Sequence, residues 1–177
     1  LKLQEGFRNP IIESSNWINN KLQGATYQKY GNSINPDKVY PVEGSLIYLS
    51  SPSPSFTEAG NTNTAVVKDS RYTSNSTYKY KDGHLVEVTS GDGITTSYYW
   101  GYNNTLPIIK AVGIDYVALS TSYLQSGGNI VTIRSALPSA QITSYAHDLG
   151  VGVITIDDLN GNASHYEYDV LGRLILI

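Results

Sequence analysis

Residues 166–174 read Tyr-Glu-Tyr-Asp-Val-Leu-Gly-Arg-Leu, and this stretch decides the fold. Residues 145–148 read Tyr-Ala-His-Asp, so aromatic residues followed by an acid recur at a spacing of roughly twenty residues. A period of this size is typical of repeat proteins, in which neighbouring units bury one another's apolar faces. Such proteins present surface or enclose space, so the pattern favours a structural role over a single catalytic centre.

An earlier stretch has the same order of features. Residues 78–100 contain an aromatic pair, Asp82-Gly83, an alternating segment, Asp92-Gly93 and a second aromatic group. An Asp-Gly pair between alternating segments is a strong signal for a β-hairpin. One hairpin is marginally stable in water, so neighbouring hairpins must stack. The sequence therefore predicts a mainly β fold of antiparallel hairpin repeats.

The remaining pattern adds further strands and one or two short helices. Pro10 at a first turn favours a helix over residues 10–22. The alternative is strand and loop, because the asparagines of that segment are poor helix formers. Apolar spacing predicts a second helix within 113–128. Strands are expected at 26–30, 38–40, 45–49, through 65–112, and at 129–134, 141–145, 151–156, 163–168 and 174–177.

The chain divides into a lead-in and a repeat region. Residues 1–64 form a β-rich lead-in with an exposed Ser/Pro-rich loop near 50–64. Residues 65–177 form hairpins that become more regular along the chain. The length of 177 residues fits about one domain, so we treat the loop as an insertion inside one β-rich body.

Composition excludes several classes of function. The net charge is −3 and the 12 Lys and Arg residues are scattered, which argues against a nucleic-acid partner. No apolar run reaches the length of a membrane span. The chain has no cysteine, so disulfides and thiolate chemistry are excluded. It has no methionine and begins at Leu1, from which we expect a processed or excised segment.

The stretch 166–174 closely resembles the tyrosine-aspartate (YD) repeat of RHS proteins, and residues 157–162 resemble the Asp-x-x-Gly-Asn turn of that family. The clear resemblance covers 142–177, and a weaker one extends back to about 65. His147 stands where the family has tyrosine, and the segment 113–128 interrupts the period. The residues that match the repeat motif are Tyr98, Trp100, Tyr145, Asp148, Tyr166, Tyr168, Asp169, Gly172, Arg173 and Leu174.

The resemblance implies a curved β-sheet that forms part of a hollow shell. In the family such shells enclose a C-terminal toxin or enzyme domain or act in surface adhesion, and similar proteins in some bacteria leave by type IX secretion. It implies a secreted or cell-surface protein whose partners are the other repeats of its own polypeptide. An open strand edge could also receive secretion-machinery or surface proteins by strand addition.

The residue types of the motif indicate the physical role of each position. Tyrosines at alternate strand positions can stack between adjacent hairpins. Gly172 relieves the turn, while Arg173 can reach Asp169 or lie over an aromatic ring.

The sequence contains no catalytic constellation and implies no cofactor. A calcium site is the weak metal candidate, and a plain turn is favoured over it; its loop would use Asp157, Asp158, Asn160 and Asn162. The alternative function is a carbohydrate-binding or adhesive β-domain, in which Trp17, Trp100 and the tyrosines stack on glycans. An enzyme is the third and least favoured class, since no Gly-x-Ser-x-Gly elbow or paired His motif occurs.

Overall fold

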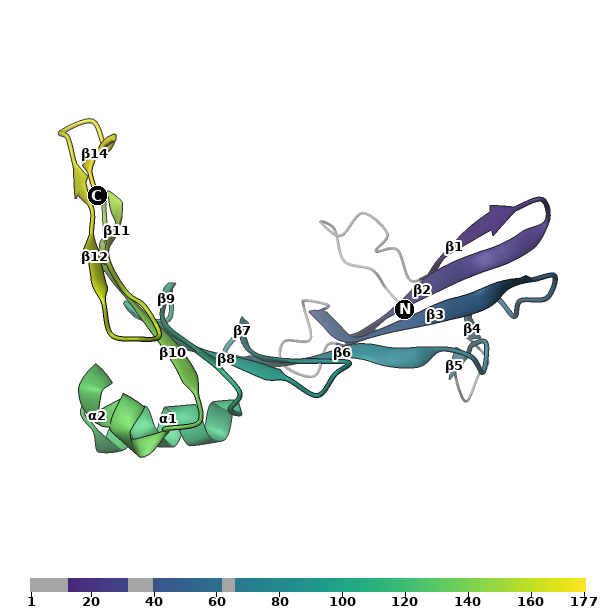
Figure 1. Cartoon of the computed structure of the whole chain (residues 1–177), viewed down its shortest axis with the longest axis horizontal. Coiled ribbons are helices and arrows are strands. Elements are labelled where there is room, and N and C mark those ends of the chain that lie inside the picture. The colour runs from purple at the N-terminus through teal and green to yellow at the C-terminus, as the bar shows by residue number, and fades with distance from the viewer. Residues whose placement is uncertain (1–12, 32–39, 62–65) are drawn as a thin grey trace. The chain divides into compact units, whose positions relative to one another are not determined.

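The computed structural model describes residues 13–31, 40–61 and 66–177 (Figure 1). The chain is mainly β with antiparallel strand pairing and two helices in the described part, so the predicted fold class is confirmed. Two compact units are present, residues 1–83 with 90–92 and residues 84–89 with 93–177. The boundary that the sequence suggests near residue 65 lies inside the first unit.

An antiparallel sheet forms the first unit. Its strands follow the order β1 (Glu13–Ile18), β2 (Lys21–Gly31), β3 (Tyr40–Ser53) and β6 (Thr73–Lys81). A separate short pair consists of β4 (Gly60–Asn61) and β5 (Val66–Val67). The expected strand at 38–40 falls largely outside the described residues.

The expected helix at 10–22 is wrong over its described part. Residues 13–18 form β1, and Lys21 begins β2. Asn19 and Asn20 both have positive φ, 49° and 61°, which is the backbone of a type I′ hairpin turn. Asparagine tolerates this region better than most residues, so the asparagines that weakened the helix pattern instead make the turn.

The core of the first unit lies under β2 and β3. Its buried side chains are Leu22, Ala25, Tyr27, Ile47 and Tyr72. Phe56 and Ala59, which follow β3, pack against this cluster. The Ser/Pro-rich segment is therefore not a simple exposed loop, because β3 runs on to Ser53 and the next residues help to cover the core.

The second unit contains most of the segment in which the hairpins are expected. Its sheet follows chain order, and a two-stranded pair comes after it. The strands are β7 (His84–Ser90), β8 (Thr95–Gly101), β9 (Leu106–Val112), β10 (Gln141–Asp148), β11 (Gly152–Asp157), β12 (Ala163–His165), β13 (Glu167–Tyr168) and β14 (Leu174–Leu176).

Turn chemistry explains why these strands fold back on one another. Asp82 and Gly83 precede β7 with φ of 51° and 82°, the type I′ combination that Asp-Gly predicts. Gly93, with φ of 84°, lies between β7 and β8. Tyr102, Asn103 and Asn104 all have positive φ and connect β8 to β9.

Helix α1 (Tyr116–Gln125) confirms the helix expected within 113–128. Asp115 caps it by accepting a hydrogen bond from the Ala118 N–H at 2.8 Å. Gly127 and Gly128 follow with positive φ and stop the helix.

The strand expected at 129–134 is wrong, because helix α2 spans Ile130–Ala136. The side chain of Asn129 accepts a hydrogen bond from the Thr132 N–H at 3.0 Å and so caps its start. Ile130, Ile133 and Leu137 lie at the spacing of one helical face and pack on the core. This spacing overrides the strand preference of the β-branched residues between them.

Both helices cover one face of the sheet in the second unit. Leu119 of α1 and Ile133 of α2 are fully buried against Ile109, Ala111 and Ile142 of β9 and β10. Figure 1 shows the two helices side by side next to β10. In the described part of the chain, no helix is both long and apolar enough to cross a membrane.

Candidate functional site

Two hairpins near the end of the second unit have the same register. In the upstream hairpin (residues 145–156), His147 is opposite Val153, and a bulge separates Ala146 from His147. In the downstream hairpin (residues 166–177), Tyr168 is opposite Leu174, and a bulge separates Glu167 from Tyr168. The two arrangements coincide at an offset of 21 residues. The similar segments 145–148 and 166–169 therefore have the same strand-pairing register, bulge included.

The turn of the downstream hairpin is organised by one carboxylate. Oδ1 of Asp169 accepts hydrogen bonds from the N–H groups of Leu171 and Arg173, both at 2.9 Å. The guanidinium of Arg173 binds Oδ2 of the same side chain at 2.7 Å. Gly172 has φ of 73° and donates its N–H to the Asp169 carbonyl at 2.9 Å. The motif residues Asp169, Gly172 and Arg173 thus act together in a single turn.

A second turn has the same hydrogen bonds. Oδ1 of Asp158 accepts from the N–H groups of Asn160 and Asn162, both at 2.8 Å, and Gly161 has φ of 86°. The pKa of the Asp158 carboxyl is lowered by the backbone and side-chain hydrogen bonds from Asn162. Hydrogen bonds from Arg173, first from its backbone and then from its side chain, lower the pKa of Asp169. Each carboxylate is therefore held in its ionised form by the turn that it closes.

The weak calcium candidate coincides with this second turn. Asp158 directs Oδ1 to two backbone N–H groups and Oδ2 to the side-chain amide of Asn162 at 3.1 Å. Asp157 accepts a hydrogen bond from the Ser144 hydroxyl at 2.9 Å. Within residues 13–31, 40–61 and 66–177, no cluster of three His, Cys, Asp or Glu side chains suits a metal ion. The carboxylate oxygens are thus engaged in holding the chain.

Tyrosine hydroxyls connect one hairpin to the next. The hydroxyl of Tyr168 donates to the Val153 carbonyl at 2.7 Å. The hydroxyl of Tyr102 donates to the carbonyl of His147 at 3.0 Å and accepts from its N–H at 2.8 Å. His147 and Val153 are opposite each other, so one residue pair is bound from both neighbouring hairpins. These bonds tie side chains to backbone at the bulge, where the strand ladder is interrupted.

The other aromatic motif residues have mixed roles. The indole N–H of Trp100 donates to the Leu85 carbonyl at 2.8 Å, and its ring lies 4.6 Å from the ring of His84. Tyr145 is half-buried, and burial, followed by the nearby Tyr98, raises its hydroxyl pKa. Trp100 is therefore a packing residue in its own unit, and its ring face is not left open for a ligand.

His147 lies at the position that corresponds to Tyr168 in the downstream hairpin, and it contacts two aromatic rings. Its ring lies edge-on to Tyr102, with centroids 5.5 Å apart, and 6.4 Å from Tyr145. Its Nδ1 is buried without a hydrogen-bond partner among the described residues. Both backbone groups of His147, its N–H and its carbonyl, are bound by the Tyr102 hydroxyl.

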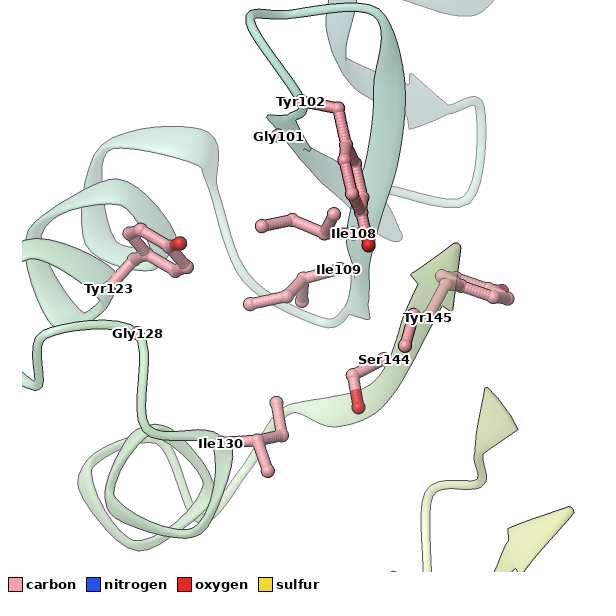
Figure 2. Close-up of a pocket in the computed structure, with 10 residues that line it drawn as sticks. Gly101, Tyr102, Ile108, Ile109, Tyr123, Gly128, Ile130, Ser144 and Tyr145 are labelled. Atoms are coloured by element: carbon pink, nitrogen blue, oxygen red, sulfur yellow. The ribbon is translucent and has the colours of Figure 1, made fainter. Parts of the chain in front are cut away.

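A pocket of about 350 Å³ opens between the helices and the sheet (Figure 2). Figure 2 shows Ile108 and Ile109 directed toward Tyr123 of α1, while the ring of Tyr145 points away. Its lining residues are Gly101, Tyr102, Ile108, Ile109, Tyr123, Gly128, Ile130, Ser144, Tyr145 and Ala146.

Isoleucines, tyrosines and small residues make up the lining of the pocket. None of its lining residues is a histidine, a lysine or a carboxylate. The Ser144 hydroxyl in its lining donates a hydrogen bond to the carboxylate of Asp157 at 2.9 Å. Ile108 packs directly on Gly101, where a Cβ would lie 2.8 Å from its Cγ2, so a larger residue at 101 would displace it.

The first unit presents exposed aromatic rings on its sheet. Tyr48 is 88% exposed and Trp17 is 41% exposed. Tyr48 borders a shallow groove of about 340 Å³ between β1, β2 and β3, together with Asn16 and Gly24. This groove is the place in the described structure where a glycan ring could stack on a tyrosine.

Two residues that organise the second unit were not singled out in the sequence. Tyr102 lies in an Asn-rich turn directly after Gly101. The local sequence carries little signal for its role. Arg134 of α2 donates to the carbonyls of Ile142 at 3.2 Å and Asp158 at 2.6 Å. Its contacts tie the helix to the second Asp-x-x-Gly turn, and they depend on the helix that the sequence pattern failed to predict.

No protein-family model matches the chain, and a search of curated proteins returned no match.

Proposed function

We propose that this chain is a non-catalytic structural segment of an exported RHS/YD-repeat protein. It contributes β-hairpins to a curved shell or stalk that encloses or displays another domain at the bacterial surface. The observation that carries the proposal is the shared register of the hairpins at 145–156 and 166–177, with equivalent bulges and an offset of 21 residues. Repeats of this length usually build an extended surface by stacking.

Three further features support a structural role. The carboxylates of Asp158 and Asp169 are used to close turns, and Tyr102 and Tyr168 use their hydroxyls to join hairpins. The lining of the second unit's pocket includes no histidine, lysine or carboxylate. The polar groups that could do chemistry are therefore employed in holding the backbone.

The proposal includes location and partners. The chain's charged fraction of 15% is low, and much of its polar surface is uncharged, which suits an exported β-protein. Its first partners are further repeats of the same polypeptide, and secretion-machinery or surface proteins could add a strand to an open edge.

An antibody raised against the 177-residue chain tests this function. In intact cells of the source bacterium we expect it to label the surface or the culture medium. The polypeptide that it captures should be longer than 177 residues and should contain a protease-resistant repeat region together with an unrelated domain. Exclusive recovery of a cytoplasmic polypeptide with no such domain would overturn the proposal.

Carbohydrate binding is the second candidate, and exposed Tyr48 is the observation that favours it. A ring that is 88% exposed beside Asn16 resembles a stacking platform with an adjacent hydrogen-bonding amide. A glycan array should show binding that Tyr48→Ala removes and that Tyr166→Ala, in the other unit, leaves unchanged. An array with no signal for the unaltered chain rejects this candidate.

A further inference from the structure

The sheet of the first unit has a solvent-facing side that is hollowed at two places. Alternate residues of β2 and β3 share this side, because side chains alternate along a strand. The pairs on it are Gly24 with Tyr48, Thr26 with Leu46, and Gln28 with Gly44. The intervening residues Ala25 and Ile47 are buried in the core, so the core covers only the opposite side of the sheet.

The two hollows adjoin along the strands. One is the groove of about 340 Å³ beside Tyr48 and Gly24, and the other is a pocket of about 200 Å³ over Gly44. Thr26 and Leu46 line both of them, so they form the ridge between the two hollows. Four residues of β2 separate the positions that border the outer ends, which corresponds to about 13 Å of strand. This span is longer than a single sugar ring.

Glycine in the middle of a strand makes the second hollow. Such a glycine weakens the strand and often marks a place where another group approaches the backbone closely. A Cβ at Gly44 would lie 2.6 Å from Oγ of Ser76 and 3.6 Å from Oε1 of Gln28. Two side-chain oxygens therefore lie over the backbone of Gly44, in the space that a larger residue would fill.

The hydrogen bonds of this hollow leave one acceptor and one donor directed at a ligand. Nε2 of Gln28 donates to the Glu43 carbonyl at 2.8 Å, and this bond fixes the amide with Oε1 over Gly44. The Ser76 hydroxyl donates to the hydroxyl oxygen of Tyr78 at 2.9 Å. The proton of Tyr78 is then the one to be donated to a ligand, and Oε1 of Gln28 is the acceptor for a ligand hydroxyl.

The lining of both hollows indicates an uncharged ligand. The described lining residues include amides, hydroxyls, tyrosines and glycines, and none of them carries a charge. Glu43 alternates onto the core side, where its Oε1 lies 3.6 Å from the Lys68 ammonium. Sugar rings combine an apolar face, which stacks on an exposed tyrosine, with neutral hydroxyls that pair with amides and phenols.

A peptide strand fits this surface less well than a sugar chain. Strand addition requires a sheet edge with unpaired backbone groups. Strand β2 is paired with β1 and β3, and β3 is paired with β2 and β6. The hollows thus lie over interior strands, whose ladders are already formed on both sides.

We propose that this side of β2 and β3 binds an uncharged, extended oligosaccharide at two subsites. One sugar ring stacks on Tyr48 beside Gly24. A second ring lies over Gly44, accepts a hydrogen bond from the Tyr78 hydroxyl and donates one to Oε1 of Gln28. This inference rests on the carbohydrate-binding candidate, to which it adds a second subsite and the chemical class of the ligand.

Neutral oligosaccharides of increasing length serve as probes. Glucose, cellobiose and cellohexaose, with mannohexaose and xylohexaose as further extended chains, are titrated into the ¹⁵N-labelled 177-residue chain. We expect a hexasaccharide to shift amide signals at 24–28, 44–48 and 75–78. It should bind at least ~10-fold more tightly than its disaccharide, because it adds two hydrogen bonds that are each worth about five-fold.

Variants of the chain separate the two subsites. Gln28→Ala and Tyr78→Phe should each weaken hexasaccharide binding about five-fold and leave cellobiose, which occupies the Tyr48 groove, unchanged. Tyr48→Ala should weaken both sugars. Thr77→Ala, at an exposed position of β6 that does not line either hollow, is the matched control and should change neither. Retained dispersion of the amide signals shows that each variant is folded.

The outcomes distinguish this inference from the candidate on which it rests. Sugar binding that Tyr48→Ala removes, but that Gln28→Ala and Tyr78→Phe leave intact, retains carbohydrate binding and overturns the second subsite. Absence of shifts with all three hexasaccharides at millimolar concentration, or equal affinity for cellobiose and cellohexaose, also overturns it. Tighter binding of hexagalacturonate than of every neutral hexasaccharide would show that the ligand is charged and would overturn the proposed class.

Discussion

The two units of this protein stabilise their cores in different ways. In the first unit, Tyr27 and Tyr72 are buried beside charged groups, and the Tyr72 hydroxyl donates to Glu13 at 2.9 Å. In the second unit, the buried cluster of Ile109, Ala111, Leu119, Ile133 and Ile142 is entirely aliphatic and is covered by two helices. An aliphatic core contains no polar groups and therefore needs no hydrogen-bond partners. A core that buries tyrosines must supply a hydrogen-bond partner for each buried hydroxyl.

Lys68 adds a charged group to the polar surroundings of these tyrosines. Its ammonium lies 5.0 Å from the ring centre of Tyr27 and 5.8 Å from that of Tyr72. It also lies 3.6 Å from Oε1 of Glu43 and 3.2 Å from the Ser45 hydroxyl. A cation in contact with two rings and a carboxylate is stabilised even when partly desolvated. The difference between the units predicts different sensitivities to substitution.

The largest effect should come from the aliphatic core. Ile133→Ala removes a fully buried side chain between α2 and the sheet and should cost about 2–5 kcal/mol in the free energy of unfolding. Chemical denaturation followed by far-ultraviolet circular dichroism measures this loss. Val131→Ala, on the same helix at a 67% exposed position, should change stability by no more than ~0.5 kcal/mol. Equal effects of the two variants would contradict the helix-covered core.

The next effect tests the polar core of the first unit. Tyr72→Phe removes the hydroxyl that donates to Glu13 and leaves that carboxylate with one partner fewer, at a cost of about 1–3 kcal/mol. Burial, followed by the hydrogen bond to Glu13, raises the pKa of Tyr72, so its hydroxyl stays protonated as a donor through neutral pH. Denaturant titration monitored by tyrosine fluorescence reports the change. Tyr48→Phe, at an 88% exposed ring, is the control and should be neutral.

A smaller effect should follow loss of the link between the two matched hairpins. Tyr168→Phe removes the hydrogen bond to the Val153 carbonyl and should cost about 1 kcal/mol, localised to the second unit. Hydrogen exchange should accelerate at residues 152–157 and 167–176 and remain unchanged in β2 and β3. Tyr166→Phe, at the residue immediately before β13, is the matched control. Accelerated exchange throughout the chain would contradict a local link.

The smallest effect concerns the turn carboxylates and acid pH. Asp158 and Asp169 have folded-state pKa values below the unfolded value of about 3.9. Their contribution to stability is therefore fully present above that unfolded pKa and is lost as the pH falls through the folded pKa. Melting temperatures measured between pH 6 and pH 2 should fall less steeply in Asp169→Asn than in the unaltered chain. Parallel curves would show that this carboxylate does not stabilise the folded state.

The sequence predicted the β class and the hairpin turns because their signals are local. Asp82-Gly83 and the Asp-x-x-Gly turns depend on residues within a few positions of one another, and their backbone angles agree with the residue types. Tertiary contacts determine the elements that the sequence pattern did not predict. Residues 130–136 have strand-forming Val131 and Thr132, yet Ile133 is buried against β9 and β10 as part of a helix.

The candidate site was predictable in part. Asp169, Gly172 and Arg173 form the turn that their types indicate, and Tyr168 reaches the neighbouring hairpin. Tyr102 lies 45 residues from His147 along the chain, and a helical pair separates them. A contact at this distance leaves no trace in local spacing, so the residue that binds both backbone groups of His147 could be identified only in three dimensions.

The Asp-x-x-Gly turn satisfies its own backbone within five residues, since one carboxylate accepts two N–H groups and the glycine closes the loop. The hydrogen bonds that shape this turn all lie within residues 169–173. The conformation of this turn is therefore set by residues 169–173 themselves, whereas the position of the hairpin depends on the bond from Tyr168 to its neighbour.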